Sequence, residues 1–228
     1  IVTENKIKKN KENVIFLHTI NARKLLAEVS YKILKRKPRK IIAVTGTNGK
    51  SSIADFYFQI LNLNKKRVAS IGTIGVQYKK KKKFLNNTTL DPVQLTSILK
   101  NLKKEKIEYL IMEASSHGLK QNRLDGILFD IGLFTNLSHD HLDYHKNMKN
   151  YLKSKLYLFE NLIKKNGDII TDSNIPETRN LKKISIKKKL NLSLIFNKEK
   201  GIQLISHKFS NENQILEIKF KNKKYKLT

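Results

Sequence analysis

A glycine-rich segment between an apolar run and a helical pattern carries the clearest chemistry in this chain. It reads Thr45-Gly-Thr-Asn-Gly-Lys-Ser51. The backbone N–H groups of such a loop, and of the helix N-terminus behind it, bind phosphate oxygens. Lys50 would reach the β- and γ-phosphates, and the Ser51 hydroxyl would hold Mg²⁺. We expect a variant nucleotide-binding loop, because Val44 replaces the usual first glycine. The alternative is a turn with incidental glycines.

A carboxylate at the end of a second apolar run is a candidate ligand for the same metal ion. Glu113 follows Tyr-Leu-Ile-Met, a predicted strand, and precedes Ala-Ser-Ser-His-Gly. Ligands of open α/β sheets bind at the carboxyl ends of strands, and Mg²⁺ prefers oxygen ligands. A glutamate at a strand end is more often a plain surface residue. The small, hydroxyl and imidazole residues that follow favour a ligand loop here.

A third group of polar residues follows another predicted strand. Residues 134–145 read Phe-Thr-Asn-Leu-Ser-His-Asp-His-Leu-Asp-Tyr-His and hold three of the six histidines of the chain. The spacing matches no standard zinc site. One histidine could join a magnesium site, although histidine is an unusual Mg²⁺ ligand. The alternative is helix capping by Asp140 or Asp143 with solvated imidazoles.

Strand and helix patterns alternate around these motifs. The N-terminal part predicts a strand over residues 14–17 and a helix capped by Asn21. The later expected strands are residues 41–44, 67–71, 109–112, 129–134 and 167–170, and the expected helices are residues 51–63, 92–104 (capped by Asp91) and 151–163. This alternation predicts an α/β fold with a mainly parallel sheet and helices on both faces. The three motifs would then share one edge of the sheet.

The pattern changes after about residue 185. Residues 192–196, 202–206, 214–220 and 224–227 read as short strands, with Lys221-Asn-Lys as a hairpin turn. We therefore expect a small antiparallel β segment at the C-terminal end, beginning near Lys182.

Composition limits the possible partners. The net charge is +28, from 47 basic and 19 acidic residues, but the lysines are spread along the chain and no aromatic residues alternate with them. A stacking platform for nucleic acid is therefore not expected. The dense run Lys79–Lys83 is interpreted as a solvated hairpin or loop tip. The chain has no cysteine, which fits a reducing cytoplasm, and no apolar run of about 18 residues that would cross a membrane.

Three segments in order resemble the central domain of the Mur ligases. They are residues 45–51, 113–119 and 135–145, within a resemblance that extends from about Arg39 to Asn174. The second and third segments are most similar to the MurE type, the UDP-N-acetylmuramoyl-tripeptide synthetases. The departures are mild: Ser51-Ser52 stands where threonines are common, and His139 where arginine is common.

The resemblance implies a role for individual residues. Those implied to bind ATP are Gly46, Thr47, Asn48, Gly49, Lys50, Ser51, Ser52 and Asn136. Those implied to contact a UDP-muramoyl substrate are Asn87, Thr88, Thr89, Ser115, Gln121 and Arg123. The implied magnesium ligands are Ser51, Glu113, His141 and a carbamate on Lys155. The implied catalytic residues are Lys50, Glu113, His141 and Lys155. A solvated helix lysine is the alternative for Lys155.

The family further implies ATP-dependent amide-bond formation through an acyl phosphate. The third amino acid, diaminopimelate or lysine, would be added to UDP-MurNAc-L-Ala-D-Glu in peptidoglycan synthesis by a cytoplasmic monomer. Residues 1–36 would be the tail of a UDP-binding domain with a linker, and residues 37–228 the ATP-binding domain. Because the chain starts at Ile1 and the C-terminal ligase domain is absent, we expect a fragment that is inactive alone.

Other functions remain open at this point. A folylpolyglutamate synthetase-like ligase shares the variant loop, but the Asn87-Thr-Thr and Ser-Ser-His-Gly segments favour the muramoyl substrate. A basic nucleic-acid-binding P-loop protein would show a steep salt dependence of its affinity for any DNA. A degenerate nucleotide-binding remnant is disfavoured, since Lys50, Glu113 and His141 are intact.

Overall fold

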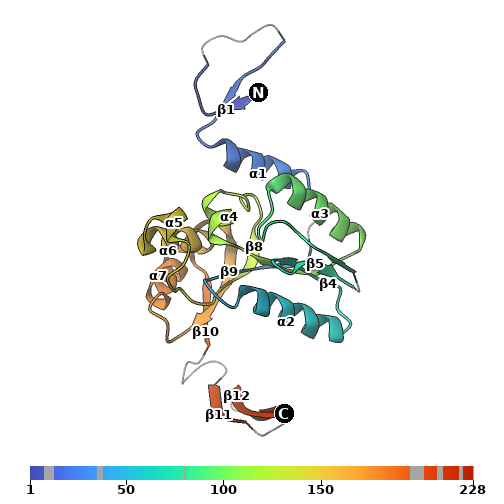
Figure 1. Ribbon diagram of the computed structural model, residues 1–228, viewed down its shortest axis with the longest axis vertical. Coiled ribbons are helices and arrows are strands. Elements are labelled where there is room, and N and C mark those ends of the chain that lie inside the picture. The colour runs from blue at the N-terminus through green and yellow to red at the C-terminus, as the bar shows by residue number, and fades with distance from the viewer. Residues whose placement is uncertain are drawn as a thin grey trace.

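An eight-stranded sheet forms the body of the protein (Figure 1). The computed structural model describes residues 1–7, 13–34, 38–79, 81–195, 203–209, 213–220 and 223–227. The strand order is β10-β9-β8-β3-β7-β4-β5-β6. The strands are β3 (Lys40–Thr45), β4 (Val68–Gly72), β5 (Gly75–Tyr78), β6 (Lys81–Lys83), β7 (Tyr109–Glu113), β8 (Phe129–Phe134), β9 (Ile163–Asp172) and β10 (Asn191–Ile195). Pairing is parallel from β10 to β4 and antiparallel in β5 and β6, so the mainly parallel α/β sheet is confirmed.

Helices cover both faces of this sheet. They are α1 (Ala22–Lys32), α2 (Lys50–Leu63), α3 (Pro92–Lys104), α4 (Ser116–Lys120), α5 (Leu142–His145), α6 (Met148–Tyr157), the π-helical η1 (Leu158–Leu162) and α7 (Thr178–Lys188). Helix α2 lies on one face, where Ala54 packs on Ile42, Val44 and Ile111. The larger core cluster lies on the other face and includes Ala27 and Tyr31 of α1 together with Leu95, Leu99 and Leu102 of α3. Helix α1 is therefore built into the same core as the sheet.

The two helix starts predicted from capping residues are confirmed. The Asn21 side chain accepts a hydrogen bond from Lys24 N at 2.9 Å, and Asp91 accepts from Val93 N and Gln94 N at 3.0 Å each. Such side chains satisfy N–H groups that have no partner inside the helix. Both caps fix where the chain turns into the helix.

Some predicted boundaries in the first three quarters of the chain were wrong. The strand expected over residues 14–17 is the two-residue β2 (Leu17–His18), which, within the described part of the chain, pairs with β1 (Val2–Thr3) alone, outside the main sheet. Helix α6 begins at Met148 because Asn147 caps it by accepting from Asn150 N at 2.9 Å. Strand β9 is longer than predicted because it pairs with β8 on one side and β10 on the other.

The predicted β-rich region from Lys182 was also wrong in its start. Residues 178–188 form α7, whose Leu181, Ile184 and Ser185 are buried, and β10 joins the main sheet in parallel. The small antiparallel sheet is confirmed further on as β11 (Gln203–Phe209), β12 (Gln214–Phe220) and β13 (Lys223–Leu227). Residues 196 and 202 and the turn residues 221–222 lie outside the described residues.

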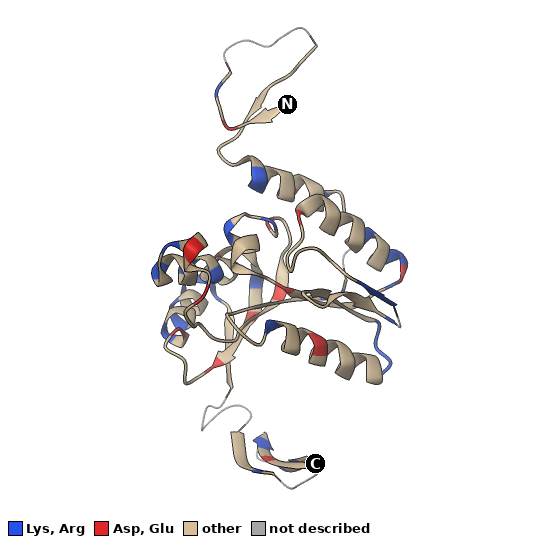
Figure 2. Cartoon of the chain, viewed as in Figure 1, with Lys and Arg blue, Asp and Glu red and all other residues tan. Residues whose placement is uncertain are grey.

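Charge is distributed as the sequence indicated. Figure 2 shows basic residues on helices of both faces and on the small C-terminal sheet, rather than in one stripe. Lys81–Lys83 form β6, which pairs with β5 as a hairpin at the sheet edge. Lysine on an edge strand discourages pairing with other chains. Among the described helices, none has the length and apolarity needed to cross a bilayer.

Candidate functional site

The predicted phosphate loop joins the end of β3 to the first turn of α2. Gly49 has φ 81° and stands at the N-cap of α2, a left-handed conformation that favours glycine. A Cβ on Gly46 would lie 1.8 Å from the Thr135 hydroxyl oxygen. Gly49 is thus required by its backbone conformation, and Gly46 both by its φ of 148° and by the lack of space for a side chain. Lys50, Ser51 and Ser52 form the first turn of α2, where backbone N–H groups are free for an anion.

The segment after β8 holds this loop in place. Asn136 accepts from Asn48 N at 2.9 Å through its side chain and from Thr47 N at 2.9 Å through its backbone carbonyl. The Thr135 hydroxyl donates to Asn48 O at 2.6 Å, and Ser138 N donates to the Thr47 hydroxyl at 3.0 Å. The Thr135-Asn136 pair of the third motif therefore buttresses the loop of the first.

Two lysine ammonium groups converge on one carbonyl of the loop. Lys50 Nζ donates to Gly46 O at 3.0 Å and to Thr47 O at 2.7 Å, and Lys155 Nζ donates to Gly46 O at 2.7 Å. Lys155 is only 1% exposed, and its ammonium lies 4.2 Å from the Tyr151 ring centroid. Burial lowers the pKa of Lys155, and the positive charge of Lys50 lowers it further, to about 7. Burial also lowers the pKa of Lys50, with Glu113 acting against it.

Glu113 lies against the start of α2, as its place at the end of β7 predicted. Its side chain is 2% exposed and accepts from the Ser51 hydroxyl at 3.0 Å, the Thr73 hydroxyl at 3.2 Å and Thr73 N at 2.8 Å. Gly72 leaves the space for it, because a Cβ there would lie 2.1 Å from Glu113 Oε1. Sequence analysis missed Gly72 and Thr73, although their position directly after a buried strand was a signal.

The residues fit a magnesium ion only in part. The Ser51 hydroxyl and the Glu113 carboxylate are adjacent hard oxygen donors, as Mg²⁺ prefers, with its other positions left to water and phosphate. His141 instead lies against the ring of His117, with 4.9 Å between centroids, and Lys155 is held at Gly46 O. Within the described ranges, no three histidine, aspartate or glutamate side chains gather closely enough to hold a metal.

The histidine-rich segment packs against the loop that follows Glu113. His141 has a left-handed backbone, with φ 51°, at the start of α5. His145 is completely buried, and its Nε2 lies 3.0 Å from the Ser116 hydroxyl. Burial lowers the pKa of His145 to about 4, so its imidazole is neutral at pH 7. The predicted ligand loop after Glu113 and the histidine-rich segment are therefore in direct contact.

The predicted substrate residues divide into two groups. Three of them, Asn87, Gln121 and Arg123, line one pocket of about 290 Å³ together with Arg23 of α1, which sequence analysis did not single out. The others connect this pocket to Glu113 through hydrogen bonds. Thr88 and Thr73 hydroxyls lie 2.9 Å apart, the Thr89 hydroxyl donates to Glu113 O and accepts from Ser115 N at 3.0 Å each, and Arg123 donates to Thr89 O at 2.6 Å.

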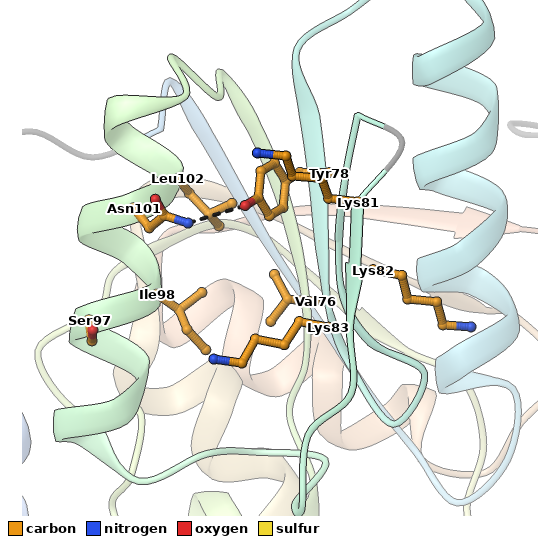
Figure 3. Close-up of a pocket in the computed structure, with 9 residues that line it drawn as sticks. All are labelled: Val76, Tyr78, Lys81, Lys82, Lys83, Ser97, Ile98, Asn101 and Leu102. Carbon is orange, nitrogen blue, oxygen red and sulfur yellow. Dashed lines mark hydrogen bonds between the residues drawn. The ribbon is translucent and has the colours of Figure 1, made fainter.

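A larger hollow of about 550 Å³ lies between α3 and the β5–β6 hairpin (Figure 3). In this close-up, Lys81 and Lys83 flank Val76, Ile98 and Leu102, and Asn101 donates to the Tyr78 hydroxyl at 3.2 Å. None of the predicted site residues lines it, so it is separate from the phosphate loop.

Comparisons with known proteins place these motifs in a family context. The family model described as "Mur ligase middle domain" matches residues 44–228. A curated relative from Rickettsia montanensis, named UDP-N-acetylmuramoyl-L-alanyl-D-glutamate--2,6-diaminopimelate ligase, is 41% identical over 207 residues. That alignment covers 85% of this chain and 43% of the relative, so the chain spans less than half of the relative's length.

Solved structures share the fold. A structure of a UDP-N-acetylmuramoyl-L-alanyl-D-glutamate--2,6-diaminopimelate ligase matches with a TM-score of 0.84 at 24% identity, covering 100% of this chain and 46% of that one. The apo form of L. casei FPGS matches with a TM-score of 0.69 at 12% identity, covering 89% and 55%. At these identities the two structures support the fold alone.

The contact between Gly72 and Glu113 gives a first prediction. Gly72→Ala should displace the carboxylate from Ser51 and weaken magnesium-dependent nucleotide binding about tenfold or more, since a charged hydrogen-bonded group loses its position. Calorimetry with and without Mg²⁺ measures this. Ser70→Ala, at a buried position of the same strand, should bind as the wild type does. Equal affinity of the Gly72→Ala protein would show that Glu113 does not serve the metal.

Burial of Lys155 makes stability depend on pH. Its pKa falls from 10.5 in the unfolded chain to about 7 in the folded one, so the unfolded chain binds more protons between these values. Protonating the buried Lys155 amine costs stability, so the free energy of unfolding falls as the pH falls from 10.5 towards 7. Between pH 7 and pH 9 the wild type should gain about 2 kcal/mol more than Lys155→Met, as measured by urea unfolding. Equal gains in the free energy of unfolding for the two proteins would show that the Lys155 ammonium is exposed to solvent.

Proposed function

The chain belongs to the Mur ligase family, and from this premise we propose that the protein is an ATP-dependent ligase that adds the third amino acid to UDP-MurNAc-L-Ala-D-Glu. The observation that carries the proposal is the convergence of Lys50, Lys155 and the Ser51–Glu113 pair on one phosphate loop. We propose residues 37–228 as the ATP-binding domain, with residues 1–36 as the tail of a UDP-binding domain. The reaction would take place in the cytoplasm, as a step of peptidoglycan synthesis.

The proposed reaction has two steps. A carboxylate oxygen of the dipeptide attacks the γ-phosphorus of ATP, and ADP leaves. The amine of the incoming amino acid then attacks the acyl carbon of the acyl phosphate, inorganic phosphate leaves, and the amine gives up a proton. Positioning and neutralisation of phosphoryl charge are the main tasks of the protein in such a transfer.

The phosphate loop supplies most of that neutralisation. Lys50 is held on Gly46 O and Thr47 O, and we propose that it exchanges these carbonyls for the β- and γ-phosphate oxygens of ATP. Gly46, Thr47, Asn48, Gly49, Ser51, Ser52 and Asn136 complete the ATP site in this proposal. Magnesium, held by Ser51 and Glu113 and joined by His141, would supply further positive charge to the phosphates.

Lys155 is proposed to act as a carbamate. Its amine is buried beside the loop, and a neutral amine is the form that reacts with CO₂. The ammonium first loses one proton; the neutral amine nitrogen then bonds to the carbon of CO₂ and loses a second proton. A cation is thereby replaced by an anion. An anion there would attract magnesium, whereas an ammonium repels it.

The substrate residues and partners follow the family. We propose that Asn87, Gln121 and Arg123 contact the UDP-muramoyl substrate directly, and that Thr88, Thr89 and Ser115 complete that region. Diaminopimelate is the proposed third amino acid, because the Rickettsia montanensis relative is named for it. The proposal includes a monomer with no nucleic-acid or membrane partner.

Two other functions are distinguishable from this one. A folylpolyglutamate synthetase-like ligase has support from the structural match to L. casei FPGS, but that match is 12% identical and supports the fold alone. Such a ligase would consume ATP with a folate substrate and not with the muramoyl dipeptide. A basic P-loop protein that binds DNA would hold it at physiological salt, whereas the even spread of lysines predicts weak binding that moderate salt removes.

Removal of Lys50 tests the nucleotide site. Lys50→Ala should lower the affinity for Mg·ATP about a hundredfold in the full-length protein, because the charge that faces the phosphates is lost. Calorimetry gives the affinity, and circular dichroism confirms the fold. Lys66→Ala, an exposed lysine beyond the end of α2, is the matched control and should bind normally. Unchanged ATP binding in the Lys50→Ala protein would refute the assignment.

Variants of two lysines of α6 test whether Lys155 acts as a carbamate. Lys155→Ala should reduce ligation at least a hundredfold, and acetate should partly restore it by supplying a carboxylate in the vacated space. Lys153→Ala, two positions earlier in the same helix, should keep its activity. The measurement is release of phosphate with UDP-MurNAc-L-Ala-D-Glu and diaminopimelate. Full activity of the Lys155→Ala protein would remove Lys155 from the mechanism.

A further inference from the structure

We propose that Arg23 of α1 binds an anionic group of the acyl substrate together with Arg123. The inference rests on the function proposed above and extends its substrate pocket to a helix that precedes the phosphate-loop strand in the chain. The chemistry recognised is a phosphate or a carboxylate, and the substrate carries both. Arg23 lies outside the segments that sequence analysis matched to the family.

The pocket is built from parts of the chain that are far apart in sequence. Arg23 comes from the first turn of α1, Asn87 from the segment before α3, and Gln121 and Arg123 from the turn after α4. Two guanidinium groups and two carboxamides therefore line one hollow of about 290 Å³. Guanidinium groups bind phosphate and carboxylate through paired N–H donors.

The two arginines differ in how many donors are already used. Arg123 donates from Nε and Nη2 to the Gln121 side-chain oxygen, at 3.0 and 2.6 Å, and from Nη1 to Thr89 O. An arginine has five N–H groups, so two of these remain. The Arg23 side chain makes no hydrogen bond or ion pair with another described residue. Its neighbour Lys24, by contrast, is paired with Glu28 at 3.8 Å.

Among the described residues that line this pocket, Asp91 is the one carboxylate, and it does not cancel the positive charge of the two arginines. Asp91 caps α3, and its Oδ1 accepts hydrogen bonds from Val93 N and Gln94 N, which holds one of its two carboxylate oxygens at the helix start. Two positive side chains and one negative side chain leave an excess of one positive charge in the lining. An anionic group is therefore the ligand that the pocket favours.

Helix α1 is fastened to the turn that carries Arg123. Asn21 Nδ2 donates to Asn122 Oδ1 at 3.0 Å, and the buried Tyr31 hydroxyl donates to Arg123 O at 2.8 Å. The backbones also approach closely, because a Cβ on Gly126 would lie 2.9 Å from the Cα of Glu28. The separation of the two backbone segments that carry Arg23 and Arg123 is therefore set before a ligand arrives, so binding has to order only the Arg23 side chain.

The test compares neighbouring charges on the same helix in the full-length protein. Arg23→Gln should weaken the binding of UDP-MurNAc-L-Ala-D-Glu about ten- to a hundredfold, the loss expected for a charge-assisted hydrogen bond. Lys24→Gln removes the same charge one residue away and should change the affinity less than twofold. Mg·ATP affinity and melting temperature should be unchanged in both variants. Calorimetry measures the affinities.

Two fragments of the substrate identify which anion Arg23 binds. A loss seen with UDP alone assigns the diphosphate, and a loss seen only with N-acetylmuramoyl-L-Ala-D-Glu assigns a carboxylate. Arg23→Gln binding the whole substrate as tightly as Lys24→Gln would overturn the inference while leaving the proposed function intact. A wild-type protein that binds ATP but not the muramoyl substrate would overturn the proposed function, and this inference with it.

Discussion

The parallel alignment of four neighbouring strands is the constraint on which the site depends. The register pairs Val44 with Glu113 and Thr45 with Phe134, while Ile71 of β4 pairs with Met112. The chain therefore leaves β3, β7, β8 and β4 at the same level of the sheet. The four short segments that follow these strands meet there and hydrogen-bond to one another: Thr73 and Ser51 hold Glu113, and Thr135 and Asn136 hold the phosphate loop. A shift of one strand by one residue would turn its side chains to the other face.

The phosphate loop is dominated by the positive charge of two lysines rather than by apolar packing. Lys50 and Lys155 share the Gly46 carbonyl, and placing two cations there is costly unless an anion arrives or one of them loses its proton. The loop is thus built for negative charge before any ligand is bound. Two carboxylates act on these cations: Asp140 on both lysines and Glu113 on Lys50. Glu113 also accepts hydrogen bonds from Ser51 and Thr73, which keep it directed at the start of α2.

The segment that carries the proposed substrate residues connects the phosphate loop region with the Arg23–Arg123 pocket. Thr89 lies between them, with its hydroxyl on the Glu113 carbonyl and its own carbonyl on Arg123. The pocket of Arg23 and Arg123 is therefore coupled through two hydrogen bonds to the strand that presents Glu113. Because α1 shares the main core, the pocket is also rigid on its other side. The proposed substrate pocket and the phosphate loop are therefore parts of one packed unit.

Local sequence patterns determined most of the elements and the choice of the main candidate site residues. The glycines, Lys50 and Ser51 follow from one contiguous segment, and the Asn21 and Asp91 caps act within a single turn, so no distant contact was needed to predict them. The length of β9 and the start of α7 depended on neighbours across the sheet, which periodicity does not contain. Only the tertiary structure brought Arg23 to Arg123, Gly72 to Glu113 and Lys155 to Gly46, because these pairs are joined by sheet register and helix packing over long stretches of chain.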